Sequence, residues 1–274
     1  MSGLGLFKSV NPEMDYPENV RKIMKTYNYV REYNIYSTYI EKLKRFHNKH
    51  EGERCILIGT GPSLQKTDFS LIRNEILYGV NTFFKGLEKY NVKCRYWTVI
   101  DRDVFNKHYE SLLNIDTTFF LSGTAVRDYI SNKEKYQKNA KNEPILIRNY
   151  DGIRNYNHKD WGDIRKGLYS AGNVMPRCLQ IAYYLGFKEV YLIGCDCSYS
   201  GGRHHHFDGE KYDFQYNGTE GKEFLKEEKQ HWSKVFNSYR ICKKAYEKDN
   251  RKIYNATPGG ELEVFERKKL EEVF

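Results

Sequence analysis

Short apolar runs alternate with longer amphipathic segments from Arg54 to the end of the chain. Between most of these runs lie segments whose apolar residues recur at helical spacing, most clearly at 174–185 and 222–248. Alternation of strands and helices predicts an α/β fold with a mostly parallel, Rossmann-like sheet and helices on both faces. The predicted strands are 54–58, 76–80, 95–100, 117–121, 144–148, 189–193 and 252–256.

Two segments depart from this alternation. Residues 17–48 have an apolar stripe at helical spacing after Pro17 and end in the polar run "HNKHEGE", which predicts a helical extension over residues 1–50. The extension would pack on the α/β domain at 51–274 or on a partner chain. In the second case the protein would be an oligomer. Residues 198–221 are rich in Gly, His and Asp and have weak periodicity, which predicts a lid-like loop.

The composition is that of a globular protein, with 39% hydrophobic and 15% aromatic residues. The net charge of +9 is spread along the chain and suits a solvated basic surface, an anionic substrate or peripheral contact with an anionic membrane. We expect no nucleic-acid partner, because no known binding motif is present. The chain also lacks an apolar run of membrane-spanning length, a signal-peptide core and C-x-x-C pairs. We therefore expect a cytoplasmic protein, at most peripheral at the inner membrane face.

Glycines and polar residues follow the predicted strands. The carboxyl ends of parallel strands share one edge of a sheet, and ligands bind there. The glycine loop at 59–63 permits close backbone approach, but it has neither G-x-G-x-x-G spacing nor the lysine of a P-loop, so a tight turn remains an alternative. The edge residues are Gly59, Thr60, Gly61, Pro62, Ser63, Asn81, Asp101, Asp103, Ser170, Gly172 and Asp196.

Several side chains at this edge have two interpretations. Asp101 and Asp103 would hold a divalent cation against a diphosphate or would cap the next helix. Ser170 and Gly172 precede helix 174–185 and would bind an anion or serve as an ordinary N-cap. Asp196 would accept a hydrogen bond from a sugar hydroxyl or simply end its strand. Three histidines at 204–206 lie in the predicted lid, where a three-histidine metal site is disfavoured because consecutive residues rarely face one point.

The motifs together resemble a known family. "LIGTGPSL", then Asn81, then "SAGNVMPRCLQIAYYLGFKEVYLIGCD" and a later "HF" are similar to the MptE-like domain, named after an archaeal 6-hydroxymethyl-dihydropterin pyrophosphokinase. The same order is similar to small bacterial sialyltransferases that use CMP-sialic acid. The resemblance covers roughly residues 54–265 and does not reach the predicted N-terminal helix.

The resemblance implies a role for each matching residue. The glycine loop would hold the phosphate side of a nucleotide, together with Ser170 and Gly172, while Asn81 would contact the nucleotide or its sugar. Tyr199, displaced by one residue from the family position, and the His205-His206 run would stabilise the departing phosphate. His231, which is 35 residues beyond Asp196, is at the place of the general base, and His206, which precedes Phe207 as in the family's "HF", is the rival candidate.

Two departures from the sialyltransferase pattern keep alternatives open. Thr60 and Asp101 stand where those enzymes have asparagine, and the Asp101/Asp103 pair suits a Mg²⁺-assisted reaction. The first hypothesis is a glycosyltransferase of surface-glycan synthesis that transfers sugar from CMP-sialic acid or a related CMP-nonulosonate to a glycan and requires no cofactor. The second is a Mg²⁺-dependent pyrophosphokinase that acts on ATP and a hydroxymethyl pterin. The third is a non-catalytic accessory protein.

Overall fold

The computed structural model describes residues 36–150, 161–169, 173–197, 204–208, 211–212 and 222–274. The chain divides into two units, 1–38 and Tyr39–Phe274, and the second contains the sheet. Residues 36–44 are helical and residues 45–52 form turns, so the helix predicted to end at 48 ends four residues earlier. Tyr39, Leu43, Phe46 and His50 are buried in the second unit. This unit therefore begins ahead of the domain start expected at residue 51.

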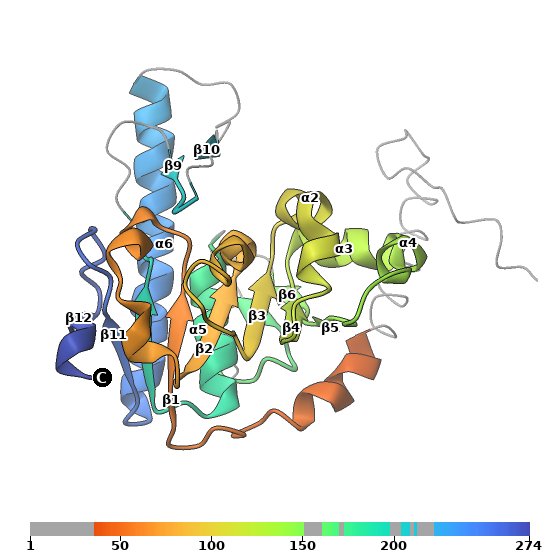
Figure 1. Cartoon of the computed structure of the whole chain (residues 1–274), viewed down its shortest axis with the longest axis horizontal. Helices are drawn as coiled ribbons and strands as arrows, with labels where there is room; N and C mark the ends of the chain where they lie inside the picture. Colours follow the sequence, from red (N-terminus) through yellow and green to blue (C-terminus); the bar gives the residue numbers. More distant parts are fainter. Residues whose placement is uncertain (1–35, 151–160, 170–172, 198–203, 209–210, 213–221) are drawn as a thin grey trace, which may run out of the picture. The chain divides into compact units, whose positions relative to one another are not determined.

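Eight strands form one sheet in the order β12-β11-β8-β1-β2-β3-β4-β5, and all neighbouring pairs are parallel (Figure 1). This confirms the predicted α/β fold. Strand β5 is shorter than predicted, and the edge strand β12 was not predicted. The strands are β1 (Arg54–Ile58), β2 (Ile76–Val80), β3 (Tyr96–Val99), β4 (Thr118–Leu121), β5 (Ile145–Leu146), β8 (Glu189–Ile193), β11 (Lys252–Asn255) and β12 (Glu266–Arg267).

The helices connect these strands. The two clearest predicted helices, α5 (Val174–Leu185) and α6 (Lys222–Lys248), have the predicted bounds. The β1–β2 connection contains only the short 3-10 helices η1 (Pro62–Lys66) and η2 (Phe69–Ile72). The remaining helices are η3 (Asn81–Gly86), α2 (Arg102–Leu112), α3 (Thr124–Ser131), α4 (Lys133–Gln137) and η5 (Leu270–Glu272).

Two small ladders lie outside the main sheet. Strands β6 (Asn149–Tyr150) and β7 (Leu168–Tyr169) pair in parallel. Strands β9 (His204–His205) and β10 (Lys211–Tyr212) pair antiparallel within the segment predicted as a loop at 198–221. That segment therefore contains short regular structure.

Aromatic side chains fill both faces of the sheet. Tyr96 packs against Phe120 on the face covered by α5, and both rings are buried. On the opposite face, Trp97 packs against Phe83 of η3. Helix α6 packs on α5, where the Tyr246 hydroxyl donates a hydrogen bond to the Leu179 carbonyl. Among the described helices, none has the length and apolar character needed to cross a membrane.

Candidate functional site at the carboxyl edge of the sheet

The connections change direction between β1 and β8. From β1 the chain builds β2 to β5 on one side, whereas β8, β11 and β12 lie on the other. In an open parallel sheet, this switch point forms a crevice beyond the strand ends, where ligands bind. Gly59 donates a backbone hydrogen bond to Ile193 at 2.8 Å, and Gly61 donates one to Gly194 at 2.9 Å. The predicted glycine loop therefore borders the crevice and is joined to the end of β8.

Ser63 and Asp196, which are predicted site residues from distant parts of the chain, meet in this crevice. Asp196 accepts hydrogen bonds from the Ser63 backbone N–H at 3.1 Å and from the Ser63 hydroxyl at 2.7 Å. A Cβ atom at Gly61 would collide with the Asp196 carboxylate. Gly61 is therefore required by a side chain of the same protein, and the Ser63 N–H that would face a phosphate already has an anionic partner.

A C-terminal loop at 257–263 forms the other wall around Asp196. The Glu261 N–H donates to the Asp196 carbonyl at 2.7 Å, and a Cβ at Gly260 would collide with the Asp196 backbone. The Cys195 N–H donates to the Thr257 hydroxyl at 3.1 Å. Sequence reasoning missed this wall, although Thr257-Pro-Gly-Gly after the last predicted strand is a turn signal.

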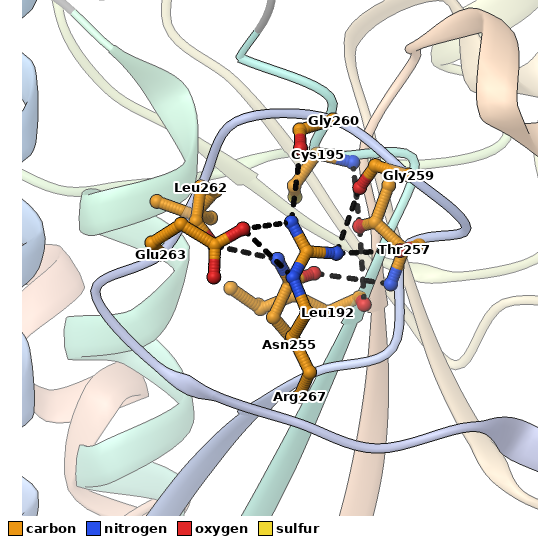
Figure 2. Close-up of polar contacts among 9 residues, drawn as sticks. All are labelled: Leu192, Cys195, Asn255, Thr257, Gly259, Gly260, Leu262, Glu263 and Arg267. Atoms are coloured by element: carbon orange, nitrogen blue, oxygen red, sulfur yellow. Dashed lines mark hydrogen bonds and ion pairs between the residues drawn. The ribbon is translucent and has the colours of Figure 1, made fainter.

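Arg267 of β12 holds this loop in shape. Figure 2 shows its guanidinium donating to the carbonyls of Thr257, Gly259 and Gly260, at distances of 3.2, 2.8 and 2.9 Å. The same guanidinium pairs with the Glu263 carboxylate. One planar cation thus satisfies three carbonyls of a loop that contains two glycines at positive φ, Gly259 and Gly260.

Phe207 of the predicted lid contacts the glycine loop. The Phe207 N–H donates to the Thr60 carbonyl at 2.9 Å, and the Gln65 side chain donates to the Phe207 carbonyl at 2.8 Å. The Phe207 ring is buried against Phe83 and Tyr90. His206, immediately before Phe207, is therefore next to the crevice. Lys85 and Asp208 form a partly buried ion pair at 2.8 Å that holds the same segment.

Asn81 combines a left-handed backbone with a buried side-chain oxygen that has no hydrogen-bond partner among the described residues. It follows β2 with φ of 45°, a left-handed conformation that asparagine tolerates. Its backbone carbonyl accepts a hydrogen bond from the Trp97 indole, but its buried Oδ1 has no hydrogen-bond partner among the described residues. The neighbouring Thr82 hydroxyl is likewise buried without one. Such atoms are costly to bury, so a polar ligand that donates to Asn81 would be stabilised.

Asp101 and Asp103 have other partners. Asp101 Oδ1 caps α2 by accepting from the N–H groups of Asp103 and Val104 at 2.8 and 3.0 Å. The exposed Asp103 carboxylate pairs with Arg102. A Mg²⁺ ion would compete with these contacts, and among the described residues no group of three or more His, Cys, Asp or Glu side chains converges to hold a metal. As arranged, Asp101 is the N-cap of α2 and Asp103 is the ion-pair partner of Arg102.

His231 lies in the first half of α6, in edge-to-face contact with Trp232. Burial, and to a smaller extent the nearby Lys234 charge, lowers the pKa of its imidazole. Tyr239, eight residues later, contacts the Cys197 thiol just past Asp196. At about 1.5 Å per residue, His231 is therefore about 12 Å further along the helix axis. Figure 1 shows α6 extending beyond the carboxyl ends of the strands in that direction.

Four predicted site residues are not placed by these contacts. Ser170, Gly172 and Tyr199 lie outside the described residues. For His205, only the backbone pairing of β9 is described.

The fold and its edge define a Rossmann-like α/β protein whose topological switch point lies between β1 and β8. The chain belongs to the family described as 6-hydroxymethylpterin diphosphokinase MptE-like, which matches residues 13–202. The match starts earlier than the resemblance seen in the motifs, and it ends before β9, α6 and the loop at 257–263.

Two solved structures are similar to the chain. One is the MAf glycosyltransferase from Magnetospirillum magneticum AMB-1, with 12% identity over 83% of this chain and a TM-score of 0.49. This chain covers 35% of that protein, so it spans about a third of its length. The other is a short-chain dehydrogenase from Oenococcus oeni PSU-1, with 11% identity over 81% of this chain and 86% of the other, and a TM-score of 0.19. No curated protein matches the chain.

Proposed function

We propose that the protein is a glycosyltransferase of surface-glycan synthesis that uses a nucleotide-activated sugar. The donor would be CMP-sialic acid or a related CMP-nonulosonate, and the acceptor would be a glycan. The observation that carries the proposal is the buried Asn81 Oδ1, which has no hydrogen-bond partner among the described residues and follows β2, next to β1 at the switch point. An amine or hydroxyl of a nucleotide would supply the missing donor.

Asp196 would contribute to donor binding without losing its contacts to Ser63. Each carboxylate oxygen accepts one hydrogen bond from Ser63, and a carboxylate has about four acceptor positions. The remaining positions would accept hydrogen bonds from ribose or sugar hydroxyls. In this arrangement, Ser63 orients the carboxylate and Gly61 leaves room for it.

Sugar transfer from a CMP donor breaks the bond between the anomeric carbon and the phosphate oxygen, and a proton leaves the acceptor hydroxyl. Hydrogen-bond donors near the phosphate and a base near the acceptor would therefore lower the barrier. His206, next to the glycine loop, would stabilise the departing phosphate together with His205 and Tyr199. His231 would take the acceptor proton, because burial lowers the pKa of its imidazole and so favours the neutral form that accepts a proton.

The metal-independent reaction and the pyrophosphokinase alternative differ in their use of Asp101 and Asp103, which would hold Mg²⁺ only in the alternative. The family name favours the alternative, which requires ATP and a divalent cation. Thermal-shift measurements with CMP, ADP and ATP, each with and without Mg²⁺, separate the two. CMP at 100 times its dissociation constant would stabilise the protein by about 2.7 kcal/mol. Stabilisation by ATP with Mg²⁺ alone would favour the pyrophosphokinase, and no stabilisation by any nucleotide would favour an accessory protein.

Turnover of variants tests the histidine roles. We expect His231→Ala to keep the affinity for CMP and to reduce kcat by at least about 10²-fold. His206→Ala should also slow turnover, with a loss that grows for poorer leaving groups. The exposed His47 provides a control, and His47→Ala should leave kcat unchanged. If His231→Ala retains turnover and His206→Ala abolishes it, the base is His206.

A further inference from the structure

Arg177 is a buried cation at the same carboxyl edge of the sheet, near the ends of β3 and β4 and away from the switch point between β1 and β8. It lies in the first turn of α5 and its exposed fraction is 6%. Its Nη1 is 2.8 Å from the position that a Cβ would take at Gly123. Gly123 follows β4 and also adjoins the carbonyl of Ile100, which follows β3. The guanidinium therefore lies against the carboxyl ends of β3 and β4.

Helix α3 begins beside the guanidinium, and α5 carries it. Helix α3 starts after Gly123, which has φ of 68° and provides no side-chain cap. Helix α5 starts three residues before Arg177. The N-terminus of a helix carries a partial positive charge, so a cation in the first turn of α5 is placed against the dipole. The N-terminus of α5 is capped by Asn173, whose side chain accepts from the Met175 N–H, so the open N-terminus at this place is that of α3. A helix N-terminus and a guanidinium side by side favour an anion.

Ser122 supplies an independent sign of a ligand. The residue is fully buried, and its hydroxyl has no hydrogen-bond partner among the described residues. Its backbone N–H donates to the Val99 carbonyl, so the β3–β4 ladder continues through it. By strand alternation it shares a face with Phe120, whose register partner Thr98 contacts Cys178 of α5. The Ser122 side chain is therefore on the face covered by the helix that carries Arg177.

We propose that Arg177, Ser122 and the first turn of α3 form a binding subsite for an oxyanion, either phosphate or carboxylate. The proposed function, on which this assignment of the ligand rests, offers both: the phosphate of the nucleotide and the carboxylate of the transferred sugar. Strands β3 and β4 are the second and third neighbours of β1. At about 4.8 Å per strand, the subsite is roughly 10–14 Å from the glycine loop, within reach of an extended nucleotide sugar.

Binding of small anions tests the subsite. We expect inorganic phosphate or N-acetylneuraminate to raise the Tm of the parent protein saturably, and Arg177→Gln to abolish this effect. Ser122→Ala removes a buried hydroxyl that has no hydrogen-bond partner among the described residues, so its Tm without ligand should be unchanged or higher, whereas its anion affinity should fall about 10-fold. Arg73→Gln changes an exposed arginine and serves as the control. Ser122→Ala is not expected to impair folding. Its anion affinity therefore tests the subsite by itself if Arg177→Gln does not fold.

Titration calorimetry identifies the source of the anion. If the subsite binds the nucleotide phosphate, CMP binds more tightly than cytidine to the parent protein but not to Arg177→Gln. If it binds the sugar carboxylate, Arg177→Gln loses N-acetylneuraminate and keeps the preference for CMP. Unchanged binding of both anions by both variants, or no anion binding by the parent protein, overturns the subsite. Phosphate binding that depends on Arg177, without any nucleotide binding, overturns the proposed function and leaves the subsite intact.

Discussion

The Asp196 carboxylate accepts two hydrogen bonds from Ser63, one from its backbone N–H and one from its hydroxyl. The two residues are 133 positions apart and come from the segments after β8 and β1. Their contact joins the two sides of the switch point. Ser63 is buried, so the carboxylate interacts with it in surroundings with little water on that side.

Ser63→Ala should destabilise the protein, because it removes a hydrogen bond to a charged group. We expect a loss of about 1.5–3 kcal/mol in the free energy of unfolding, measured by urea denaturation. Ser70 provides a matched control, since its N–H and hydroxyl both donate to Asp68 at an exposed position. Ser70→Ala should cost clearly less. Equal losses in the two variants would show that burial adds nothing to the Ser63–Asp196 contact.

Gly61→Ala should destabilise the protein through Asp196 and not through backbone strain. Gly61 has φ of −68° and ψ of 157°, a conformation open to any residue, so the main conflict is the collision with the carboxylate, with the Gly194 carbonyl oxygen as a second close neighbour. We expect a loss of about 1–3 kcal/mol. In an Asp196→Ala background the same substitution should cost much less. A double-mutant cycle by thermal denaturation measures this coupling, and additive effects would contradict the explanation.

Arg267→Lys should loosen the loop at 257–263 although the charge is kept, because an ammonium group cannot span three carbonyls and Glu263 at once. We expect faster amide hydrogen exchange in this loop and at Glu261, whose N–H is bonded to Asp196. Arg73→Lys, at an exposed position, should leave the exchange unchanged. Unaltered exchange in Arg267→Lys would mean that the loop holds its shape without the guanidinium.

His50 should make the stability depend on pH. Its imidazole is buried, stacks on Phe187 and is hydrogen-bonded to Glu53 and to the Tyr96 hydroxyl. Burial lowers the pKa of His50, although Glu53 opposes the shift. Below about pH 6.5 the unfolded chain therefore binds a proton that the folded protein resists, and stability falls as the pH falls towards the folded pKa.

The measurement compares the free energy of unfolding between pH 7.5 and 5. His50→Gln should show a shallower decline than the parent protein, with a difference of at most about 1.4 kcal/mol per pH unit for one proton. His47→Gln, at an exposed position, should follow the parent curve. Parallel curves for the parent protein and His50→Gln would contradict the role assigned to this imidazole.

Local pattern was enough to predict the sheet and the two long helices. Strands β1, β2 and β8 and helices α5 and α6 have the predicted bounds. In these segments, the spacing of the apolar residues alone shows which face is buried and which kind of element they form. The carboxyl-edge positions of the glycine loop, Asn81 and Asp196 followed from the parallel order of these strands. The C-terminal wall and β12 were missed because two-residue strands and turn residues have no periodicity of their own.

Tertiary structure alone decided what these residues contact. In the sequence, Gly61 has the same signature whether it makes room for a phosphate or for Asp196, and the carboxylate that fills the space is 135 residues away. Asp101 likewise suits a metal or a helix N-terminus in the sequence, and in the folded protein its Oδ1 caps α2. Residues 206–208 of the predicted lid find their partners in Thr60, Gln65 and Lys85. Side-chain chemistry can be read locally, but the partner that satisfies a polar group is set by which distant segments the packed core brings together.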